Sequence, residues 1–464
     1  MSDSKIDFND IEQWAAEQWG RTCLGDKRRT RRAVKLGEAL ASQPGEGLPT
    51  QTQSWGDLKA AYKLLHETDV THAALIRPHC EQVRERAVAS GAKVVLQIQD
   101  TTELDYTNHP RTVGLGRIGD DHGRGLLVHS CLTVIPTTAT PQIMGVAAQQ
   151  VWTRPERAFT GHETRAERDA RAKESDVWAT VVEEIGSAPL EGVKFVSVGD
   201  RASDIFSYVR KARANGWHVL LRVTQNRVVT SADGMRDKLL DYARRLREAT
   251  TKEIELRGRD GKPKRRVTLK VSFGAVLLHA PQIGSERKQA AIQGWVVRCW
   301  SEAEETGEAI EWVLFTTIEV ADAAQALEVV EWYSHRWLIE EYHKCLKSGC
   351  RIEASQLQSA EALASLLGFK SIVALRMLQL REKSRTGGAA KATEEVPREF
   401  VEVVRRKFGW AGTLEQITLR EFWRGVARLG GFIGRRSDGE PGWQTLWRGW
   451  QRLQDLAWSL QMKT

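Results

Sequence analysis

A group of charged residues near position 340 has the composition and spacing of a site that handles phosphate. If the segment EWYSHRWLIEEYHKCLKSGC (331–350) forms an α-helix, with about 100° per residue, five of its side chains fall within one arc roughly 80° wide: Tyr333, Arg336, Glu340, Lys344 and Lys347. A carboxylate surrounded by Arg and Lys suits a site that holds a metal ion beside a polyanion. The same pattern fits a solvated helix face with intrahelical ion pairs, and the helix alone favours that second interpretation.

Two more acids follow short apolar runs that are typical of β-strands. One run, 94–98, is followed by Asp100, and the run in KFVSVGD is followed by Asp200. Two acids at the ends of neighbouring strands and a third on a later helix can converge on a pair of divalent ions, because hard oxygen ligands hold Mg²⁺ and leave positions for phosphate and water. In such a site one ion activates the attacking oxygen and the other stabilises the leaving oxygen. The predicted chemistry is cleavage or transfer of a phosphodiester.

Other acids close to these positions remain alternatives for the same roles: Glu103, Asp105, Asp204 and Glu341. Helical phase argues against Glu341, which falls roughly 60° outside the arc shared by the bases. An acid at the end of a strand often only caps the next turn, so neither Asp100 nor Asp200 is informative singly. The combination of three acids with the basic helix face favours a metal site.

The elements that would position these residues alternate between strands and helices, which indicates a layered α/β domain. Strands are expected at about 94–98, 126–135, 142–151, 194–199, 218–223 and 312–320, and helices at 163–185 and 203–215. From 224 to 310 the sequence holds a charged helical piece, a hairpin signal at RGRDGKPKRRV and the strand AIQGWVVRCW. This pattern predicts a β-rich insertion.

Helices are expected before this domain. Residues 10–44 predict two helices, the second with Asp26 as its N-cap, and residues 56–67 predict a third. The second helix is the densest basic run of the chain: Lys27, Arg28, Arg29, Arg31, Arg32 and Lys35. Such a helix repels itself unless phosphates neutralise it. We therefore expect it to contact DNA, with a merely solvated face as the alternative.

Helices are also expected after the α/β domain. Residues 356–383 form an apolar helical pattern, RTGGAAKATEEVP reads as a linker, and two amphipathic helices follow at 413–432 and 441–461. On the last helix apolar residues recur at three- to four-residue steps: Trp443, Leu446, Trp447, Trp450 and Leu453. This stripe fits either burial within the chain or a subunit interface.

Composition excludes several classes of protein. A chain of 464 residues suggests two to four domains that fold without disulfides. Lys and Arg total 68 against 60 Asp and Glu, a formal charge of +8, which favours polyanionic partners. The six cysteines show no zinc-like grouping, so we expect reduced thiols in a cytoplasmic protein. No apolar run approaches the roughly 20 residues that cross a bilayer, and MSDSKIDFND is not a signal peptide, so we expect no membrane partner.

These motifs together resemble the bacterial DDE cut-and-paste transposases of the insertion-sequence-four family, specifically the transposon-five type. The family motif is Tyr, two residues, Arg, three residues, Glu, six residues, Lys, and it is met in full by Tyr333, Arg336, Glu340 and Lys347. The segments QDTTELDY, RGLLVHS and GDRASDIFSYV are also similar to that enzyme. The likeness runs from LGDKRRTRR to LRMLQLRE and is weak in the C-terminal region.

The resemblance implies an α/β fold with a ribonuclease-H-like catalytic core, a β-strand insertion and flanking helical domains. The implied boundaries are 1–69 for a helical domain that binds DNA ends, 70–385 for the catalytic domain with its insertion at about 224–310, and 386–464 for a helical domain that mediates dimerisation. The implied catalytic and metal-binding triad is Asp100, Asp200 and Glu340, with Mg²⁺ as the metal and Mn²⁺ as a substitute.

The resemblance also implies which residues bind DNA. Arg336, Lys344 and Lys347 would contact phosphate near the cut, and Tyr333 would fix the terminal nucleotide. Trp312 aligns with a tryptophan that stacks on a flipped base, although it also opens a strand and could serve the core. The remaining implied contacts are Arg222 in the catalytic domain and Arg28, Arg29 and Arg32 on the transposon end.

We therefore expect a transposase that binds the inverted ends of its element in double-stranded DNA as a homodimer. It would cleave both strands by two-metal phosphoryl transfer through a hairpin intermediate and join the 3′ ends to target DNA. Two alternatives remain: a two-metal nuclease without strand transfer, and a non-catalytic DNA-binding repressor of transposition. The intact triad argues against the repressor, because a binding protein has no use for three convergent acids.

Overall fold

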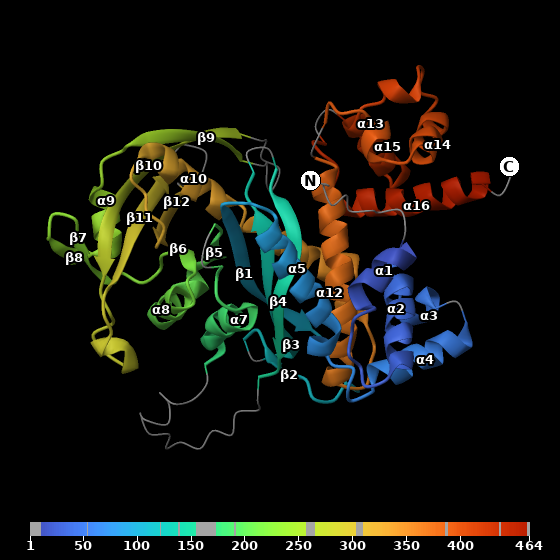
Figure 1. Cartoon of the computed structure of the whole chain (residues 1–464), viewed down its shortest axis with the longest axis horizontal. Coiled ribbons are helices and arrows are strands. Elements are labelled where there is room, and N and C mark those ends of the chain that lie inside the picture. The colour runs from blue at the N-terminus through green and yellow to red at the C-terminus, as the bar shows by residue number, and fades with distance from the viewer. Residues whose placement is uncertain are drawn as a thin grey trace.

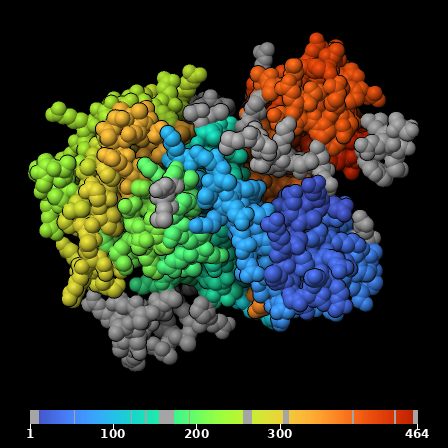
Figure 2. All heavy atoms as spheres, in the orientation of Figure 1, coloured from blue at the N-terminus to red at the C-terminus, as the bar shows by residue number. Residues whose placement is uncertain are grey.

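The computed structural model describes residues 11–461, apart from residues 53, 121, 138–139, 155–172, 190–191, 257–264, 303–309, 386–387 and 436–437. Figure 1 shows three parts along the chain: a group of N-terminal helices, a large sheet with helices on its faces, and a C-terminal group of helices. The two helical groups form separate masses on the same side of the sheet domain (Figure 2).

Four helices lie in the described part of the N-terminal region: α1 (Ile11–Trp19), α2 (Lys27–Ser42), α3 (Leu48–Gln51) and α4 (Trp55–Leu65). The three predicted helices are confirmed, and α3 is an additional short one. Asp26 caps α2 as predicted, because its carboxylate accepts a hydrogen bond from the Arg28 amide at 2.7 Å. The buried ring of Trp19 lies so close to Gly37 that a Cβ at position 37 would come within 2.2 Å of it. Close packing of α1 on α2 therefore requires glycine there.

Twelve strands of the described chain form one sheet, with the order β2-β3-β1-β5-β6-β12-β11-β10-β7-β8, while β4 pairs with β3 and β9 with β10. The first six strands are β1 (Val94–Asp105), β2 (Gly116–Ile118), β3 (Gly123–Ile135), β4 (Gln142–Trp152), β5 (Lys194–Gly199) and β6 (His218–Arg222). Strands β4, β3 and β1 are antiparallel, and β5 and β6 continue parallel to β1. This is the ribonuclease-H-like arrangement that the resemblance implied.

Strand β1 is longer than the sequence predicted. The expected strand ended at residue 98, but pairing with β3 continues as far as Asp105 opposite Gly125. Asp100 therefore lies inside a strand and not at its end. The apolar run stops where the parallel partner β5 ends, whereas the antiparallel partner β3 holds the more polar half of the strand in the sheet.

Helices cover both faces of the central strands. The helices on one face are α11 (Trp337–Lys344) and α12 (Ala360–Lys383), those on the other are α7 (Val177–Ile185) and α8 (Phe206–Ala214), and α5 (His72–Ala89) runs along β4. Successive side chains of a strand point to opposite faces, so Leu96 belongs to the core under α11 and α12 and Val95 to the core under α7 and α8. The part of the predicted helix at 163–172 lies outside the described residues.

The segment expected to be a β-rich insertion extends the same sheet. Its elements are β7 (Val228–Ser231), β8 (Arg236–Lys238), α9 (Leu239–Arg245), β9 (Thr250–Leu256), β10 (Arg265–Leu278) and β11 (Ile292–Trp300). The predicted hairpin is confirmed by the antiparallel pairing of β9 with β10, although its tip lies outside the described residues. Strand β12 (Glu311–Thr316) joins the insertion to β6, with Leu314 opposite Arg222.

Helix α12 passes through the centre of the fold. It is long and apolar enough to cross a membrane by length and composition, but 89% of its most apolar window is buried inside the protein. Its hydrophobic residues pack on α5, α11 and β4 and on the C-terminal helix. The helix is therefore a core element around which the three parts assemble.

The C-terminal group contains α13 (Ala392–Glu395), α14 (Arg398–Phe408), α15 (Leu419–Leu429) and α16 (Trp443–Gln461). The linker expected at 385–397 is partly wrong, because α13 lies within it and the Ala392 amide bonds to the Ile417 carbonyl at 2.9 Å. The apolar stripe of α16 is buried within the chain: Trp450 is 3% exposed and packs on Phe400 and Trp423. Of the two interpretations of the stripe, burial holds for its central residues.

Candidate active site

Asp100 and Asp200 lie at equivalent positions on neighbouring strands. The parallel register between β1 and β5 ends with Ile98 opposite Val198, and each aspartate follows two residues later. Asp200 is the first residue after β5, where its carboxylate caps a short 3₁₀ turn by accepting the Ala202 amide at 2.9 Å. The carboxylate of Asp100 accepts the Thr101 amide at 2.9 Å. The register therefore places both acids at equivalent positions just beyond the last paired residues of β1 and β5.

The segment predicted to be one continuous helix, and to carry the third acid, is broken into three pieces: α10 (Ala323–Ser334), α11 (Trp337–Lys344) and a π-helical turn (Cys345–Gly349). At the break, the carbonyls of His335 and Arg336 accept hydrogen bonds from the amides three residues later, at 3.0 and 3.2 Å. Tighter and wider turns change the angle between successive residues. The prediction of one continuous helix is therefore wrong, and Tyr333, Glu340 and Lys347 belong to three different elements.

Arg336 nevertheless joins the third acid to the first. Its guanidinium forms an ion pair with Glu340 and lies 3.7 Å from the Asp100 carboxylate. The pKa of Asp100 is raised to about 6, mainly by burial and then by the charge of Asp200, with a smaller effect of Glu340, while Arg336 and the Thr101 amide lower it. Three carboxylates and one guanidinium thus share one electrostatic environment.

Two aromatic residues and a second arginine border this cluster. The Tyr333 ring is 5% exposed, and its hydroxyl lies within hydrogen-bonding reach of Arg222 and Arg336. The ring of Trp312, at the start of β12, meets the Tyr333 ring edge-on at 5.4 Å between centroids. The Arg222 guanidinium also donates to the Glu311 carbonyl at 3.1 Å. The structure therefore brings Trp312, Tyr333 and Arg222 together beside Asp200.

The two lysines of the family motif lie farther along the segment and contact other acids. Lys344 bonds to Glu341 at 2.9 Å, and Lys347 lies 3.6 Å from Glu353. Glu341 also accepts from the buried guanidinium of Arg381 at 2.6 Å. Glu341 thus belongs to an ion-pair network between α11 and α12, whereas Glu340 pairs with Arg336, which lies 3.7 Å from Asp100.

The other alternative acids have structural partners. Glu103 accepts the Gly119 amide at 2.9 Å and contacts Arg154 at 3.2 Å. Asp204 is paired with Arg227 and accepts the Thr224 and Gln225 amides at 2.8 and 2.7 Å, which holds the loop after β6. These geometries give both acids a role in folding.

The donor set suits a hard divalent cation, because all three side chains offer carboxylate oxygens. Burial and mutual repulsion raise the pKa of Asp100, and a bound cation would relieve that repulsion. As the side chains stand, no three Asp, Glu, His or Cys residues among those described are arranged to hold one ion. The Glu340 carboxylate is paired with the Arg336 guanidinium.

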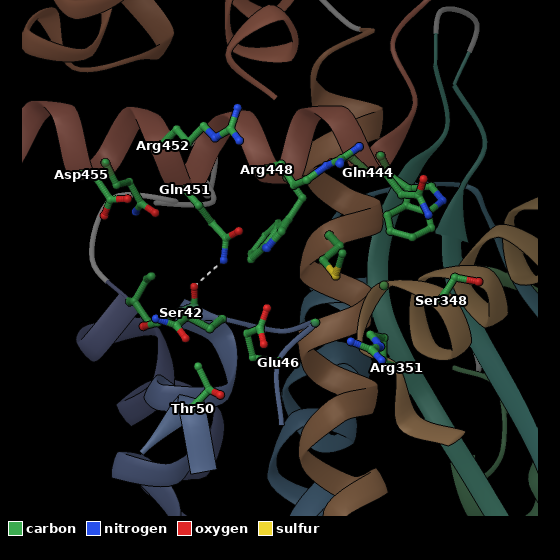
Figure 3. Close-up of a pocket in the computed structure, with 18 residues that line it drawn as sticks. Ser42, Glu46, Thr50, Ser348, Arg351, Gln444, Arg448, Gln451, Arg452 and Asp455 are labelled. Carbon is green, nitrogen blue, oxygen red and sulfur yellow. Dashed lines mark hydrogen bonds between the residues drawn. The ribbon is translucent and has the colours of Figure 1, made fainter. Parts of the chain in front are cut away.

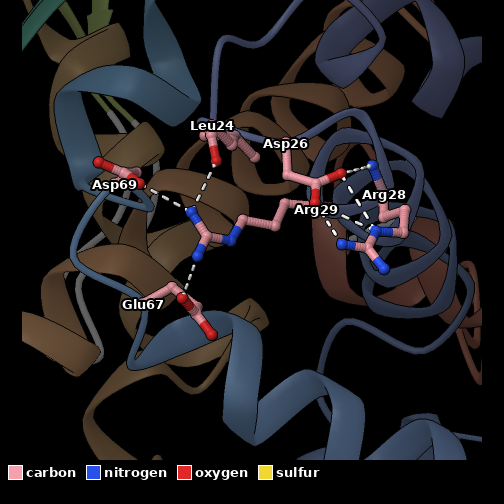
Figure 4. A network of polar contacts seen from close by, with 6 residues as sticks. All are labelled: Leu24, Asp26, Arg28, Arg29, Glu67 and Asp69. Carbon is pink, nitrogen blue, oxygen red and sulfur yellow. Dashed lines mark hydrogen bonds and ion pairs between the residues drawn. The ribbon is translucent and has the colours of Figure 1, made fainter.

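The basic helix α2 is neutralised largely by acids of its own domain. Arg29 bonds to Asp69 at 2.7 Å and to the Leu24 carbonyl at 3.1 Å, and it pairs with Glu67 (Figure 4). Arg32 and Lys35 both bond to Asp57, at 2.7 and 3.0 Å. Contrary to the prediction, several charges of this helix are therefore neutralised without phosphate.

Arg28 differs from Arg29 in its exposure. Its guanidinium bonds to Asp26 at 2.8 Å, but its side chain is 85% exposed, against 29% for Arg29.

Helix α4 shows an exposed surface that the sequence reasoning missed. Trp55 is 72% exposed at its start, and Lys59 and Lys63 are exposed one and two turns later. The spacing of four residues could have revealed this face.

Two clefts lie away from the carboxylates. One of about 890 Å³ separates the end of α2 from α16, and Figure 3 shows Gln451 of α16 bonded to the Ser42 carbonyl across it. Another of about 1040 Å³ lies at the opposite edge of the sheet, near Lys93 and Trp332. Asp100, Asp200 and Glu340 line neither cleft.

Comparison with protein families identifies all three parts of the chain. A model described as Transposase DNA-binding matches residues 11–70, one described as Transposase DDE domain matches 161–376, and one described as Transposase Tn5 dimerisation domain matches 413–459. The first covers α1 to α4, the second includes Asp200 and Glu340, and the third covers α15 and most of α16. The protein is a divalent-metal-dependent DNA transposase whose partners are DNA and a second copy of itself. The chain belongs to the Tn5-type DDE transposases.

Proposed function

We propose that Asp100, Asp200 and Glu340 are the catalytic carboxylates of this transposase and that the metal they hold is Mg²⁺, with Mn²⁺ as a substitute. The observation that carries the proposal is the shared position of the two aspartates on parallel strands, with Glu340 joined to Asp100 through Arg336. Hard carboxylate oxygens match the preference of Mg²⁺. When bound, the metal supplies activation of the attacking oxygen and stabilisation of the leaving oxygen.

The surrounding residues would orient the DNA strand. Arg336 is partly buried beside the acids, so its guanidinium can exchange the Glu340 carboxylate for a phosphate with the same fork geometry. Arg222 and Tyr333 lie next to Arg336, where they would fix the nucleotide next to the cut. Lys344, which is 60% exposed, and Lys347 would contact the backbone farther along.

We further propose that cleavage proceeds through a hairpin and that the freed 3′ ends are joined to target DNA. Trp312 is the residue that bears on the hairpin, because an aromatic face can stack on a base that has left the helix. Its edge-on contact with Tyr333 also fits a packing role. The step that fails when Trp312 is replaced by Ala distinguishes the roles: loss of hairpin formation supports stacking, and equal loss at every step supports packing.

We propose residues 1–69 as the domain that binds the transposon end, 70–385 as the catalytic domain and 386–464 as the domain that mediates dimerisation. Within the first, Arg28 is the best placed of the three predicted arginines, since its side chain is the most exposed. The face of α4 with Trp55, Lys59 and Lys63 would contact DNA as well. The reaction would take place in the bacterial cytoplasm, where chromosomal and plasmid DNA lie.

Replacement of Glu340 by Gln tests the assignment, because it keeps the shape of the side chain and removes its charge. We expect the Glu340→Gln protein to bind DNA ends like the wild type and to lose Mg²⁺-dependent cleavage. The matched control is Glu361→Gln, which changes an exposed acid in the first turn of α12. Normal cleavage by Glu340→Gln would refute the assignment.

A second assay separates transposition from simple cleavage. A two-metal nuclease would cut DNA that carries the ends but would leave a target plasmid unjoined. We expect joined products when pre-cleaved ends are incubated with a target plasmid and Mg²⁺. Persistent cutting without joined products would favour the nuclease.

A further inference from the structure

Gln149 makes hydrogen bonds with every polar position of its side-chain amide. Its nitrogen donates to the Ser130 hydroxyl at 2.8 Å and to the Tyr342 hydroxyl at 3.2 Å. Its oxygen accepts from the Ser371 hydroxyl at 2.7 Å and lies 2.9 Å from Nε2 of His72. An amide offers two N–H donors and one oxygen with two lone pairs, so its capacity is fully used.

This amide is buried at the meeting point of several elements. Gln149 is 2% exposed, and its partners come from β3, α5, α11 and α12. A buried amide that loses one partner keeps an unsatisfied donor or acceptor, which costs about 1–3 kcal/mol. The network therefore favours one arrangement of these elements over those in which a helix has rotated or shifted.

The row of residues that contains Gln149 also contains Asp100. In the sheet Asp100 pairs with Ser130, and Ser130 pairs with Gln149, so the three residues lie side by side on neighbouring strands. Tyr342, the partner from α11, lies two residues after Glu340 and is fully buried. The amide thus connects the strand position opposite Asp100 to the helix that carries Glu340.

We propose that Gln149 is a positioning residue for metal binding: through the Tyr342 hydroxyl it fixes the rotation of α11 and so the position of Glu340 relative to Asp100. This inference rests on the proposed roles of Asp100 and Glu340. Helix α11 has only eight residues between a break and a π-helical turn, so its rotation depends on side-chain contacts, among them the buried Leu338 and Ile339 and the Glu341–Arg381 ion pair. The bond from Gln149 to the inward face of the helix adds a directional constraint to these contacts.

The Tyr342→Phe variant removes the hydroxyl and leaves the ring in place. We expect its affinity for Mn²⁺ alone, measured from the electron paramagnetic resonance signal of free Mn²⁺, to fall about tenfold, as is typical when a group that orients a metal ligand is removed. Binding of end DNA should be unchanged. Cleavage should recover at high Mg²⁺ concentration, because all three carboxylates remain.

The matched control is His72→Leu, which removes a bond to the same amide from the α5 side. We expect a lower thermal midpoint and an unchanged Mn²⁺ affinity, because α11 keeps its bond to Gln149. Wild-type Mn²⁺ affinity in Tyr342→Phe, or an equal loss in His72→Leu, would overturn the positioning role.

Glu340→Gln, measured in the same titration, separates this inference from the proposed function. A loss of Mn²⁺ affinity in Glu340→Gln alone would support the ligand assignment and reject the role of Gln149. Unchanged affinity in Glu340→Gln would reject the ligand assignment itself.

Discussion

Asp100 and Asp200 each lie two residues beyond the last pair of the parallel register between β1 and β5. The backbone of the sheet therefore sets their relative position before any side-chain contact forms. Burial, and then the charge of Asp200, raises the pKa of Asp100 to about 6, so the charged form of this carboxyl group is disfavoured where it lies. Carboxyl groups with such shifted pKa values are concentrated at functional sites.

Replacing Asp200 should separate activity from stability. The Asp200→Asn protein loses a charge that repels Asp100, while its amide oxygen can still accept the Ala202 amide. We expect cleavage to fall by at least about 100-fold, with an equal or higher thermal midpoint and unchanged end binding. The measurements are a cleavage assay with Mg²⁺ and a thermal unfolding scan.

Asp204 provides the control, because it is an acid four residues away with a structural role. Its side chain is 8% exposed, and Asp204→Ala would leave the Arg227 guanidinium buried without its partner. We expect a loss of about 3 kcal/mol in the free energy of unfolding. If Asp204→Ala abolished cleavage without destabilising the protein, the two acids would have been assigned the wrong roles.

Glu341 should matter for folding and not for chemistry. It pairs with Arg381, whose side chain is 2% exposed, and it connects α11 to α12. In the Glu341→Ala protein, Glu382 remains near the Arg381 guanidinium. We therefore expect the free energy of unfolding to fall by about 3 kcal/mol, the lower end of the range for breaking a buried ion pair. Urea unfolding measures this loss, and cleavage at low temperature should remain. Lost cleavage in a stable Glu341→Ala protein would favour Glu341 over Glu340 as the third acid.

The sequence was sufficient to predict the fold class and the neighbourhood of the three acids. Alternating strands and helices predicted the α/β core. Apolar runs predicted that each aspartate follows a strand, which holds for Asp200, whereas Asp100 lies within β1. Such patterns are local and depend on which side of a strand or helix is buried. A local pattern also predicted that Asp26 caps α2, and this prediction is confirmed.

The features that sequence reasoning missed depend on contacts between distant segments. The break at His335 and Arg336 has no Pro or Gly to mark it, so periodicity predicted one helix. The charges of α2 suggested either DNA contact or a solvated face, because its partners Asp57, Glu67 and Asp69 come from later in the chain. A single sequence does not reveal which distant acids will fold onto a basic helix.

Acid should destabilise the protein through a buried histidine that joins the N-terminal helices to the sheet. Nε2 of His79 accepts the Val146 amide at 3.1 Å, and its Nδ1 lies 2.7 Å from the Gln18 side-chain oxygen, which fixes the neutral ring. Burial, and then the charge of Arg86, lowers the pKa of His79 to about 3. An unfolded histidine has a pKa of about 6.5, so the unfolded chain binds the extra proton between these values. The contribution of neutral His79 to the free energy of unfolding is therefore fully present above pH 6.5, and it decreases as the pH drops toward 3.

His79→Gln tests this dependence, since glutamine can accept the Val146 amide but does not titrate. We expect the stability advantage of the wild type over the variant to shrink below pH 6.5 by up to about 1.4 kcal/mol per pH unit. Unfolding in urea at several pH values measures the difference. Parallel pH profiles for the two proteins would show that His79 is not the group responsible.

The N-terminal domain should contact DNA through its exposed cations and not through Arg29. Lys59 and Lys63 are exposed on α4, whereas the Arg29 guanidinium bonds to two acids and a carbonyl. Each lysine that contacts a phosphate releases a counterion, so Lys59→Ala and Lys63→Ala should each weaken end binding and reduce the slope of log affinity against log salt by about one.

Arg29→Met should leave the slope unchanged and lower the thermal midpoint, because Glu67 and Asp69 lose their partner. Binding titrations at several salt concentrations check both expectations, and a reduced slope in Arg29→Met would show that this arginine exchanges its acids for phosphate.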